Sequence, residues 1–318
     1  MIRFSALKPW TLVVEENLIF VKDPEYPEPH TCTVIGASGQ AFGLLVFPGP
    51  EGFSFLHRLQ NNHEVNSPGR YLENNRSLAA QLGEKTDLDA ADRSLLKAFQ
   101  ISPISGPAPY FRSLRPGYLP WVVNEDEGRT LAYCLEAVAS LIEDLSPASA
   151  EALWSLENHY PIVEESAIRM VEKIPEPDPL SKAVLVDASR INPILARNSK
   201  RSGTAQLDFV IVPIPIGATN ERKMSMRMAV ACDADSGFAY APQPVQPNVT
   251  EGDALVTAFF DVIKSSKKIP REVQVRSESQ KIMLSAVAAA LGTELTVKPE
   301  LEALDHMLDA LLQHFAGE

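Results

Sequence analysis

The hydrophobic pattern of the last third of the chain restricts its fold more than any other part of the sequence. Residues 205–315 alternate between short runs rich in Val, Ile and Met and longer stretches whose apolar residues recur every three or four positions. The order along the chain is three strands joined by hairpin turns, then helix, strand, helix, strand and helix. Hairpins join antiparallel strands and strand–helix–strand crossovers join parallel ones, so this segment predicts one mixed sheet with helices on its faces. The first strand, at 206–217, contains Pro213 and Pro215 and is therefore expected towards an edge of the sheet.

This βββαβαβα succession resembles the ribonuclease H-like fold over about residues 205–315. Nucleases and transposases with that fold place carboxylates on the first strand, on or near the first helix, after the fourth strand and on a late helix. Together these carboxylates hold two Mg²⁺ ions for phosphoryl transfer. The resemblance implies four such positions here: Asp208 on the first strand, Glu278 after the fourth strand, Asp253 or Asp261 on the first helix, and Asp305 or Asp309 on the last helix.

The position at the end of the fourth strand departs from that pattern, because it carries Ser277 where the resemblance would place an aspartate. Carboxylates also belong at helix N-termini and on solvated helix faces for purely structural reasons. We therefore expect no working metal site and no cofactor. The alternative is a Mg²⁺ site built from Asp208, Glu278, Asp253 and Asp305.

The N-terminal part predicts a separate α+β domain with an antiparallel sheet and helices. Segments 10–23 and 30–49 are rich in Val, Ile, Leu and Phe and favour strands, and the glycines of Gly36–Gln40 favour a hairpin turn. Residues 66–85 are polar and indicate loops. Helices are expected at 50–61, 87–99, 124–145 and 147–160.

The boundary between the two domains is expected near residue 150, giving domains 1–150 and 151–318. Segment 172–182 is the most typical of a linker, since its prolines favour extended backbone, and it either joins the domains or lies inside the second one. The residues that follow it, 182–189, favour a strand.

The stretch YFRSLRPGYLPW, residues 110–121, lies directly before the helix that Asn124 is expected to cap. The prolines here and just upstream argue against a regular helix and a long strand. Its side chains favour a seat for the following helix, with the arginines stacked on the rings or paired with acidic residues of the first turn. The alternative is a recognition surface, because Arg, Tyr and Trp dominate binding hot spots. The candidate binding residues are Arg112, Arg115, Tyr118 and Trp121.

Segments 34–53 and 110–138 resemble a bacterial family of two-domain proteins of uncharacterised function. In its N-terminal domain, a glycine-punctuated hairpin and an RPGYxPW turn precede a helix with an acidic first turn. Segment 272–297, EVQVRSESQKIMLSAVAAALGTELTV, is similar to the second domain of that family. The resemblance implies the two-domain architecture and no activity.

Charge and cysteine content exclude several classes of protein. The net charge of −12 disfavours nucleic acid and anionic membranes as partners, because the field of the protein repels phosphates. Cys32, Cys134 and Cys232 are too widely spaced for a disulfide framework or a zinc site. The sequence starts without the apolar core of a signal peptide and contains no apolar run long enough for a membrane helix. We expect a cytoplasmic protein with reduced thiols.

Three hypotheses for the function follow from these patterns. The first is a non-enzymatic protein-interaction or adaptor module that binds an unidentified protein partner. The second is a Mg²⁺-dependent nuclease or phosphoryl-transfer enzyme of the ribonuclease H-like type. The third is a sensor with a small-ligand pocket between the domains, where such pockets often occur.

Overall fold

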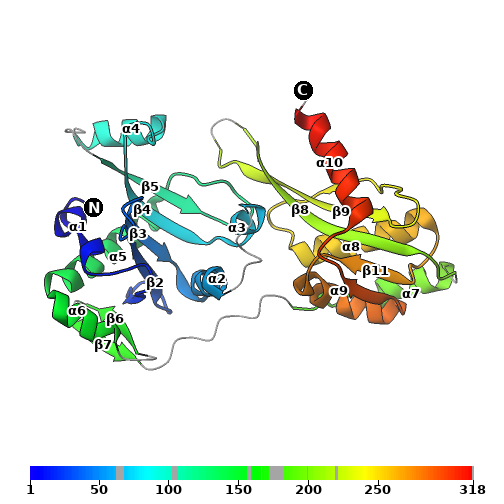
Figure 1. The fold of residues 1–318 in the computed structure, drawn as a ribbon, viewed down its shortest axis with the longest axis horizontal. Helices are drawn as coiled ribbons and strands as arrows, with labels where there is room; N and C mark the ends of the chain where they lie inside the picture. The colour runs from blue at the N-terminus through cyan, green and yellow to red at the C-terminus, as the bar shows by residue number, and fades with distance from the viewer. Residues whose placement is uncertain are drawn as a thin grey trace. The chain divides into compact units, whose positions relative to one another are not determined.

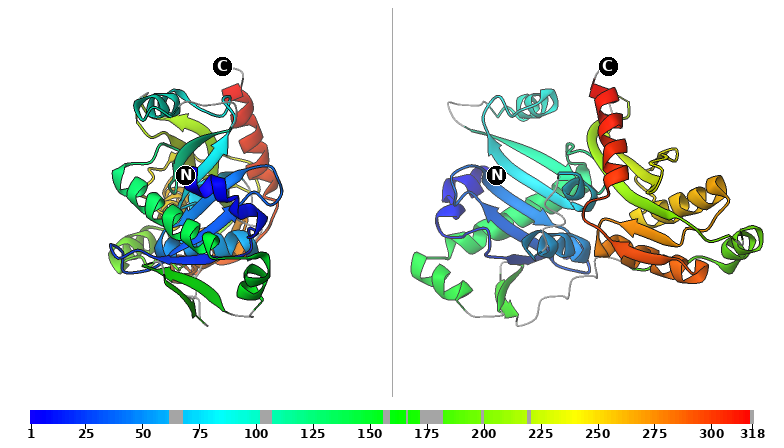
Figure 2. Two further views of the ribbon diagram at one scale, coloured as in Figure 1. Left: turned by 90° about the vertical axis from the view of Figure 1, so that its left-hand side faces the viewer. Right: turned by 45° about the vertical axis from the view of Figure 1, so that its right-hand side comes forward.

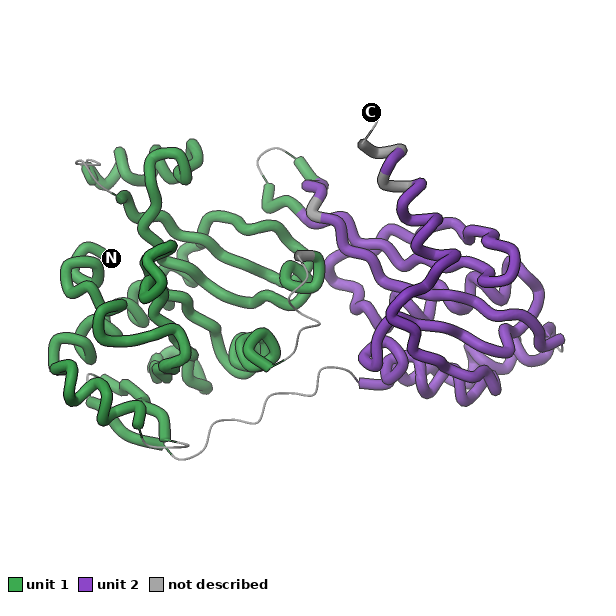
Figure 3. The backbone as a smooth tube through the Cα atoms, viewed as in Figure 1, with its two compact units in different colours: residues 1–178, 217–223 green, residues 179–216, 224–318 purple. Residues whose placement is uncertain are grey.

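Two mixed β-sheets with helices against them form an α+β structure (Figure 1). The computed structural model describes residues 1–61, 68–101, 107–155, 159–165, 167–171, 182–198, 200–218 and 221–316. The segment expected to be a linker lies, apart from its last residue, outside this description. The chain divides into unit 1, Met1–Asp178 with Gly217–Lys223, and unit 2, Pro179–Ile216 with Met224–Glu318 (Figure 3).

The sheet of unit 1 has the strand order β5-β4-β3-β2-β1-β6-β7. Neighbours are antiparallel except β1 and β6, which are parallel. The expectation of an antiparallel sheet is therefore wrong in this respect. The reason is that most of the domain separates β1 from β6, so no hairpin sets their relative direction. The strands are β1 (Ile19–Lys22), β2 (His30–Ile35), β3 (Phe42–Phe47), β4 (Ser77–Gly83), β5 (Ala108–Leu114), β6 (Tyr160–Glu164) and β7 (Ala167–Val171).

Alternate residues of these strands face opposite sides of the sheet, and each side packs against a helix. Ile19 and Val21 of β1 belong to the core formed with α5 (Glu125–Glu143). Phe20, which lies between them, belongs to the core formed with α2 (Gly49–Asn61). Unit 1 therefore has three layers, with the sheet between α5 and α2.

The expected hairpin turn at Gly36–Gln40 is confirmed, with Gly36 and Gly39 at φ 133° and 77° between β2 and β3. The expected helices are also found, as α2, α4 (Ala90–Ala98) and α5 and as the shorter α6 (Pro147–Trp154). Asn124 caps α5 through a capping box with Glu127, as expected. The shorter helical elements of unit 1 are α1 (Ile2–Leu7), the 3₁₀ helix Pro9–Thr11, α3 (Pro68–Asn74), α4 (Ala90–Ala98) and α6 (Pro147–Trp154).

Three expectations for the N-terminal part are wrong. Residues 10–18 form no strand, and the polar segment 66–85 contains α3 and the fully paired strand β4. Ser77, Ala79 and Ala80 of β4 are buried, and such small side chains give only a weak hydrophobic pattern. The proline-rich segment contains the seven-residue strand β5. Because β5 is an edge strand, its proline removes no hydrogen bond that a second neighbour would need.

The sheet of unit 2 has the strand order β10-β9-β8-β11-β12. β8–β9 and β9–β10 are antiparallel, and β8–β11 and β11–β12 are parallel, so the predicted mixed sheet is confirmed. The third strand, β10, has only two residues. The strands are β8 (Thr204–Ile216), β9 (Met224–Asp233), β10 (Gln243–Pro244), β11 (Glu272–Val275) and β12 (Glu294–Val297).

β8 is the central strand of this sheet, so its expected edge position is wrong. β11 pairs with β8 only over Thr204–Leu207, before the prolines. The later half of β8 pairs with β9 alone, and its register shifts between Val212 and Pro215. A proline in this half therefore meets a neighbour on one side only, which a strand tolerates.

Helices cover both faces of the unit 2 sheet (Figures 1 and 2). Leu207 and Phe209 of β8 pack with α8 (Glu251–Ser266) and α9 (Glu278–Leu291). On the other face Val230 of β9 packs with α10 (Glu302–Ala316). Residues 182–187 form no strand, contrary to expectation, and precede α7 (Ala188–Arg197). Of the helices in the described ranges, none combines the length and the apolar character that crossing a bilayer requires.

Candidate functional site

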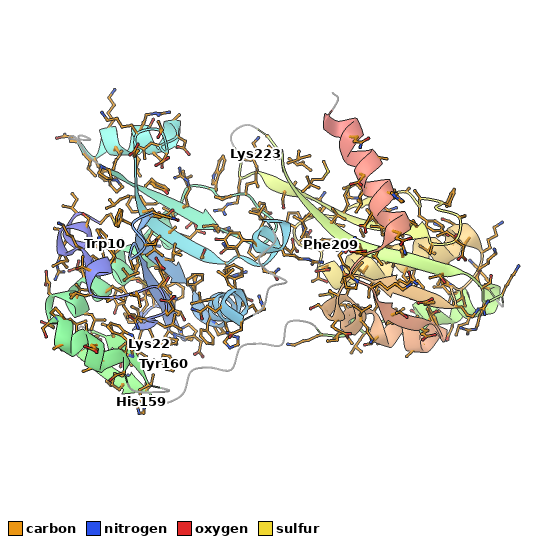
Figure 4. The ribbon with its side chains drawn as sticks, viewed as in Figure 1. Trp10, Lys22, His159, Tyr160, Phe209 and Lys223 are labelled. Carbon is orange, nitrogen blue, oxygen red and sulfur yellow. The ribbon has the colours of Figure 1, made fainter. Side chains whose placement is uncertain are left out.

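Asp208 is the only predicted catalytic candidate that is buried inside the unit 2 sheet among the described residues, with 5% of its surface exposed. It follows Leu207, the last residue of β8 that pairs with β11. Its neighbour Phe209, labelled in Figure 4, packs towards α8, so Asp208 points to the opposite face, which α10 covers. The residue that follows β11 is Arg276, and the end of this short strand brings its side chain beside Asp208.

Arg276 connects two of the predicted carboxylates. Its Nε donates to Asp208 Oδ2 at 2.8 Å, and one Nη donates to Asp305 Oδ1 at 2.6 Å. The other Nη donates to the carbonyl oxygen of Pro299 at 2.8 Å. The planar guanidinium thus bridges β8 and α10 with one positive charge between two negative ones.

A second donor set completes the hydrogen bonding of Asp208. Gln280 Nε2 donates to Asp208 Oδ1 at 2.8 Å, and the backbone N–H of Phe209 donates to the same oxygen at 2.8 Å. Gln280, fully buried, also donates to Glu251 Oε1 at 3.1 Å. Both oxygens of the Asp208 carboxylate are therefore already bonded to protein donors.

The electrostatics of this cluster favour the charged forms. Burial alone would raise the pKa of Asp305, but hydrogen bonds from Arg276 and from the Leu301 N–H hold that pKa below its ordinary value. Burial alone would lower the pKa of Arg276, but its bonds to Asp305 and Asp208 raise it. The cluster is therefore a charge-assisted bridge, in which Arg276 and Asp305 each favour the charged form of the other.

The other two predicted candidates, Glu278 and Asp253, pair with residues outside the cluster of Asp208, Arg276 and Asp305. Glu278 is exposed on the first turn of α9 and pairs with Lys281 at 3.7 Å. Asp253 accepts a hydrogen bond from Thr250 Oγ1 at 2.7 Å at the start of α8. Ser277 caps α9, its Oγ accepting from the Gln280 N–H at 3.3 Å. In the part of the chain that the structure describes, no three His, Cys, Asp or Glu side chains gather so that they could hold a metal ion.

Sequence reasoning missed Arg276 and Gln280, which are the residues that connect the cluster. The sequence does contain a signal for Arg276, because this residue immediately follows a short, buried strand. Side chains that follow parallel strands gather at the carboxyl ends of those strands, and β11 runs parallel to β8. Gln280 gives a weaker signal, because a buried glutamine in the first turn of a helix cannot be told from an exposed one by residue type alone.

Arg112, the first predicted binding residue, anchors the base of α4. Its two Nη atoms donate to Asp92 Oδ1 and Oδ2 at 2.7 and 2.6 Å, and one of them reaches Asp89 Oδ2 at 3.3 Å. Asp89 and Asp92 form the capping box of α4. The guanidinium also lies over the Tyr110 ring, 5.0 Å from its centroid, and so stacks on a different ring from those expected.

Arg115 and the aromatic residues surround the entrance to α5. Arg115 donates through Nε and Nη2 to Glu127 Oε1 at 3.0 and 2.7 Å, which confirms the expected pairing with the acidic first turn. Trp121 exchanges backbone hydrogen bonds with Ser113 at 2.7 and 3.0 Å. Tyr118 is half-buried, and its N–H donates to the Arg115 carbonyl at 3.0 Å across the turn. The stretch therefore folds back on β5 directly before the helix.

Acid should destabilise unit 1 through Asp92 and Glu127. Burial alone would raise the pKa of each, but hydrogen bonds from Arg112 to Asp92, and from Ser113, Asn124 and Arg115 to Glu127, hold both pKa values below their ordinary range. Depressed folded-state values stabilise the protein above the unfolded-state pKa of about 4, and this stability is lost as the pH falls through the folded-state values. The urea concentration at the unfolding midpoint of unit 1 should therefore decrease as the pH is lowered from about 5 to about 3. A midpoint independent of pH in this range would contradict the contribution of these pairs.

Both halves of the chain match family models. Residues 1–159 match a family described as domain of unknown function (DUF7309). Residues 191–312 match a second family, described as domain of unknown function (DUF6930). A search of curated proteins finds none that matches the chain.

Proposed function

Because the chain belongs to the DUF7309 family over residues 1–159 and carries a DUF6930 domain over residues 191–312, we propose that it is a two-domain protein-interaction protein. In this proposal the C-terminal domain has a ribonuclease H-like fold without a catalytic metal. The protein binds a protein partner rather than transforming a substrate.

The topology of unit 2 supports the ribonuclease H-like part of the proposal. The first strand, β8, is central, the second and third strands continue the sheet on one side, and the fourth and fifth lie parallel to β8 on the other. Helices follow the third, fourth and fifth strands. In this sheet the end of β11 lies beside the middle of β8, where Asp208 and Arg276 meet.

The bridge from Asp208 through Arg276 to Asp305 is the observation that carries the non-enzymatic part. A magnesium ion needs near-octahedral oxygen ligands with lone pairs directed at it. Here a guanidinium directs N–H groups at the carboxylate oxygens, so a cation entering the same space would meet a fixed positive charge. The residues present therefore do not fit a Mg²⁺ pair, and no catalytic step is assigned to this cluster.

A cleavage assay with a matched variant tests the absence of phosphoryl-transfer activity. The full chain is incubated with millimolar Mg²⁺ or Mn²⁺ and labelled single-stranded DNA, duplex DNA and RNA–DNA hybrid, beside Asp208→Asn. We expect the two proteins to give the same background cleavage with every substrate. Metal-dependent cleavage by the wild-type chain that Asp208→Asn abolishes would overturn the proposal.

The interaction itself is tested on the protein isolated at its native level from its source cells. We expect the chain to co-elute in gel filtration with a second protein in near-stoichiometric amount, and the complex to re-form from the two purified components. A chain that elutes alone, and binds none of its co-purified proteins when each is purified, would contradict the proposed function.

A further inference from the structure

An apolar pocket bordered by cations lies against α4 of unit 1. Leu88, Leu96 and Ile101 form its apolar lining, and Lys85, Arg93 and Lys97 contribute the charged side chains. The pocket has a volume of about 470 Å³, and none of the described residues that line it is acidic. Figures 1 and 2 show α4 at the end of the β4 and β5 strands, apart from α2, α5 and α6.

The three cations of this pocket have no acidic partner among the described residues. Lys85, Arg93 and Lys97 are exposed, and none of them lies within 4.0 Å of a carboxylate in the described ranges. Arg93 and Lys97 are four positions apart in α4, a spacing at which like charges repel. In a chain with a net charge of −12, these three cations around one apolar pocket form a local cluster of positive charge.

The acidic side chains nearest to α4 do not neutralise these cations. Asp89 and Asp92 are engaged by Arg112 and by the helix cap. Asp87 accepts a hydrogen bond from the Glu84 N–H at 2.7 Å and, like Glu84, does not line the pocket. The Arg112 bridge also fixes α4 on the sheet, so the pocket is formed before any ligand arrives, which lowers the cost of binding.

We propose that this surface, the α4 pocket, binds an acidic protein segment that inserts a large apolar side chain between Lys85, Arg93 and Lys97. The inference rests on the proposed interaction function and names the chemistry of the partner. Charge complementarity supports it, because carboxylates flanking an apolar side chain would pair with the cations and exclude water from the pocket.

A protein segment fits this surface better than a lipid bilayer does. An anionic membrane meets a whole face of the protein and is repelled by its net charge of −12. A peptide contacts the pocket alone, where the charged lining residues are Lys85, Arg93 and Lys97, and charges beyond a Debye length of about 8 Å are largely screened. The pocket is concave and suits one or two inserted side chains.

The test measures binding of three synthetic helical peptides to the full chain by fluorescence anisotropy. One peptide carries Leu and Phe on one face and Glu on the other, the second replaces Glu by Lys, and the third replaces Leu and Phe by Ser. The acidic apolar peptide should bind at least about tenfold more tightly than either of the others, and salt should weaken its binding. The double variant Arg93→Glu/Lys97→Glu should lose at least about tenfold of this affinity.

The matched control is Arg197→Glu/Lys200→Glu in unit 2, which makes the same change in net charge at two exposed residues. It should bind the acidic apolar peptide as the wild type does. Equal losses in both double variants, binding of the Lys peptide as tight as that of the Glu peptide, or no binding of any peptide would overturn the inference. Preferential binding of phosphatidylglycerol vesicles, abolished by Arg93→Glu/Lys97→Glu, would overturn it in favour of a membrane site.

The same variant separates this inference from the proposed function. If the native partner co-purifies with Arg93→Glu/Lys97→Glu as it does with the wild type, the α4 pocket is not the binding surface, although the interaction function stands. If no partner co-purifies with the wild type, the interaction function fails, whatever the peptides show.

Discussion

The Arg112→Ala variant is expected to lose about 3 to 5 kcal/mol of the free energy of unfolding of unit 1. The side chains of Arg112 and Asp92 are only 15% and 4% exposed, and they form two hydrogen bonds in a bidentate pair. Removing the guanidinium leaves the Asp92 carboxylate buried beside Asp89 without a cation. The loss therefore combines the broken pair with the cost of an uncompensated buried charge.

Tryptophan fluorescence in urea measures this effect on unit 1 alone, because Trp10, Trp121 and Trp154 are the three tryptophans of the chain and all lie in that unit. The control Arg93→Ala removes an exposed arginine of the same helix that has no acidic partner among the described residues, and it should change the stability by no more than about 0.5 kcal/mol.

Two companion variants identify the cause of the loss. The double variant Arg112→Met/Asp92→Leu replaces the pair by apolar groups and should recover most of the stability. Arg112→Lys keeps the charge without the bidentate geometry, and its free energy of unfolding should lie between those of the wild type and Arg112→Ala. An Arg112→Ala variant as stable as Arg93→Ala would show that the pair does not hold α4.

Elements set by local signals could be predicted from the sequence. Helix α5 has a capping residue, three acidic residues in its first turn and apolar residues at helical spacing, all within one stretch. The hairpin between β2 and β3 needs only its glycines with positive φ. In unit 2, the lengths and periodicities of the segments are enough to give the mixed sheet, because connection length decides whether neighbours run parallel or antiparallel.

Features that depend on distant partners could not be predicted. The parallel pairing of β1 with β6 joins residues about 140 positions apart, and no short-range pattern reports it. β4 is an interior strand in which Ser, Ala, Gln and Gly outnumber its two leucines, and its burial comes from neighbours on both sides more than from its own apolarity. The central position of β8 similarly depends on where β11 pairs with it, before the prolines.

The candidate site of unit 2 was predicted in part, for the same reason. Sequence position places Asp208 on the first strand and Asp305 on the last helix, and the structure brings both to Arg276. It does not bring Glu278 and Asp253 into this cluster, because both take the roles that carboxylates have at helix starts. The residue that occupies the space between the two carboxylates is Arg276, a cation. A search of the sequence for metal ligands considers carboxylates, histidines and cysteines and therefore passes over it.

The Arg276→Met variant is expected to lose about 2 to 3 kcal/mol of the stability of unit 2. The guanidinium bridges Asp208 and Asp305, and the side chain of Asp208 is 7% exposed while that of Arg276 is 32% exposed. The loss should be smaller than that of Arg112→Ala for two reasons. Water reaches the Arg276 side chain and screens its charge, and the Gln280 side chain and the Phe209 N–H still donate hydrogen bonds to Asp208. Met fills the space of the aliphatic stem, so the change reports on the charge and its hydrogen bonds rather than on a cavity.

Thiol labelling of Cys232 measures this loss in the full chain. Cys232 is fully buried in β9 of unit 2, and burial raises the pKa of its thiol to about 11, so it reacts only when the unit opens. Peptide mapping separates it from Cys32 and Cys134 in unit 1. Labelling of Arg276→Met should be about 30- to 150-fold faster than that of the wild type. Asp305→Asn, which removes the carboxylate that is 40% exposed, should cost about 1 kcal/mol or less. Cys232 labelling as slow in Arg276→Met as in the wild type would mean that the bridge does not stabilise the sheet, and the strongest argument against a metal at this position would be lost with it.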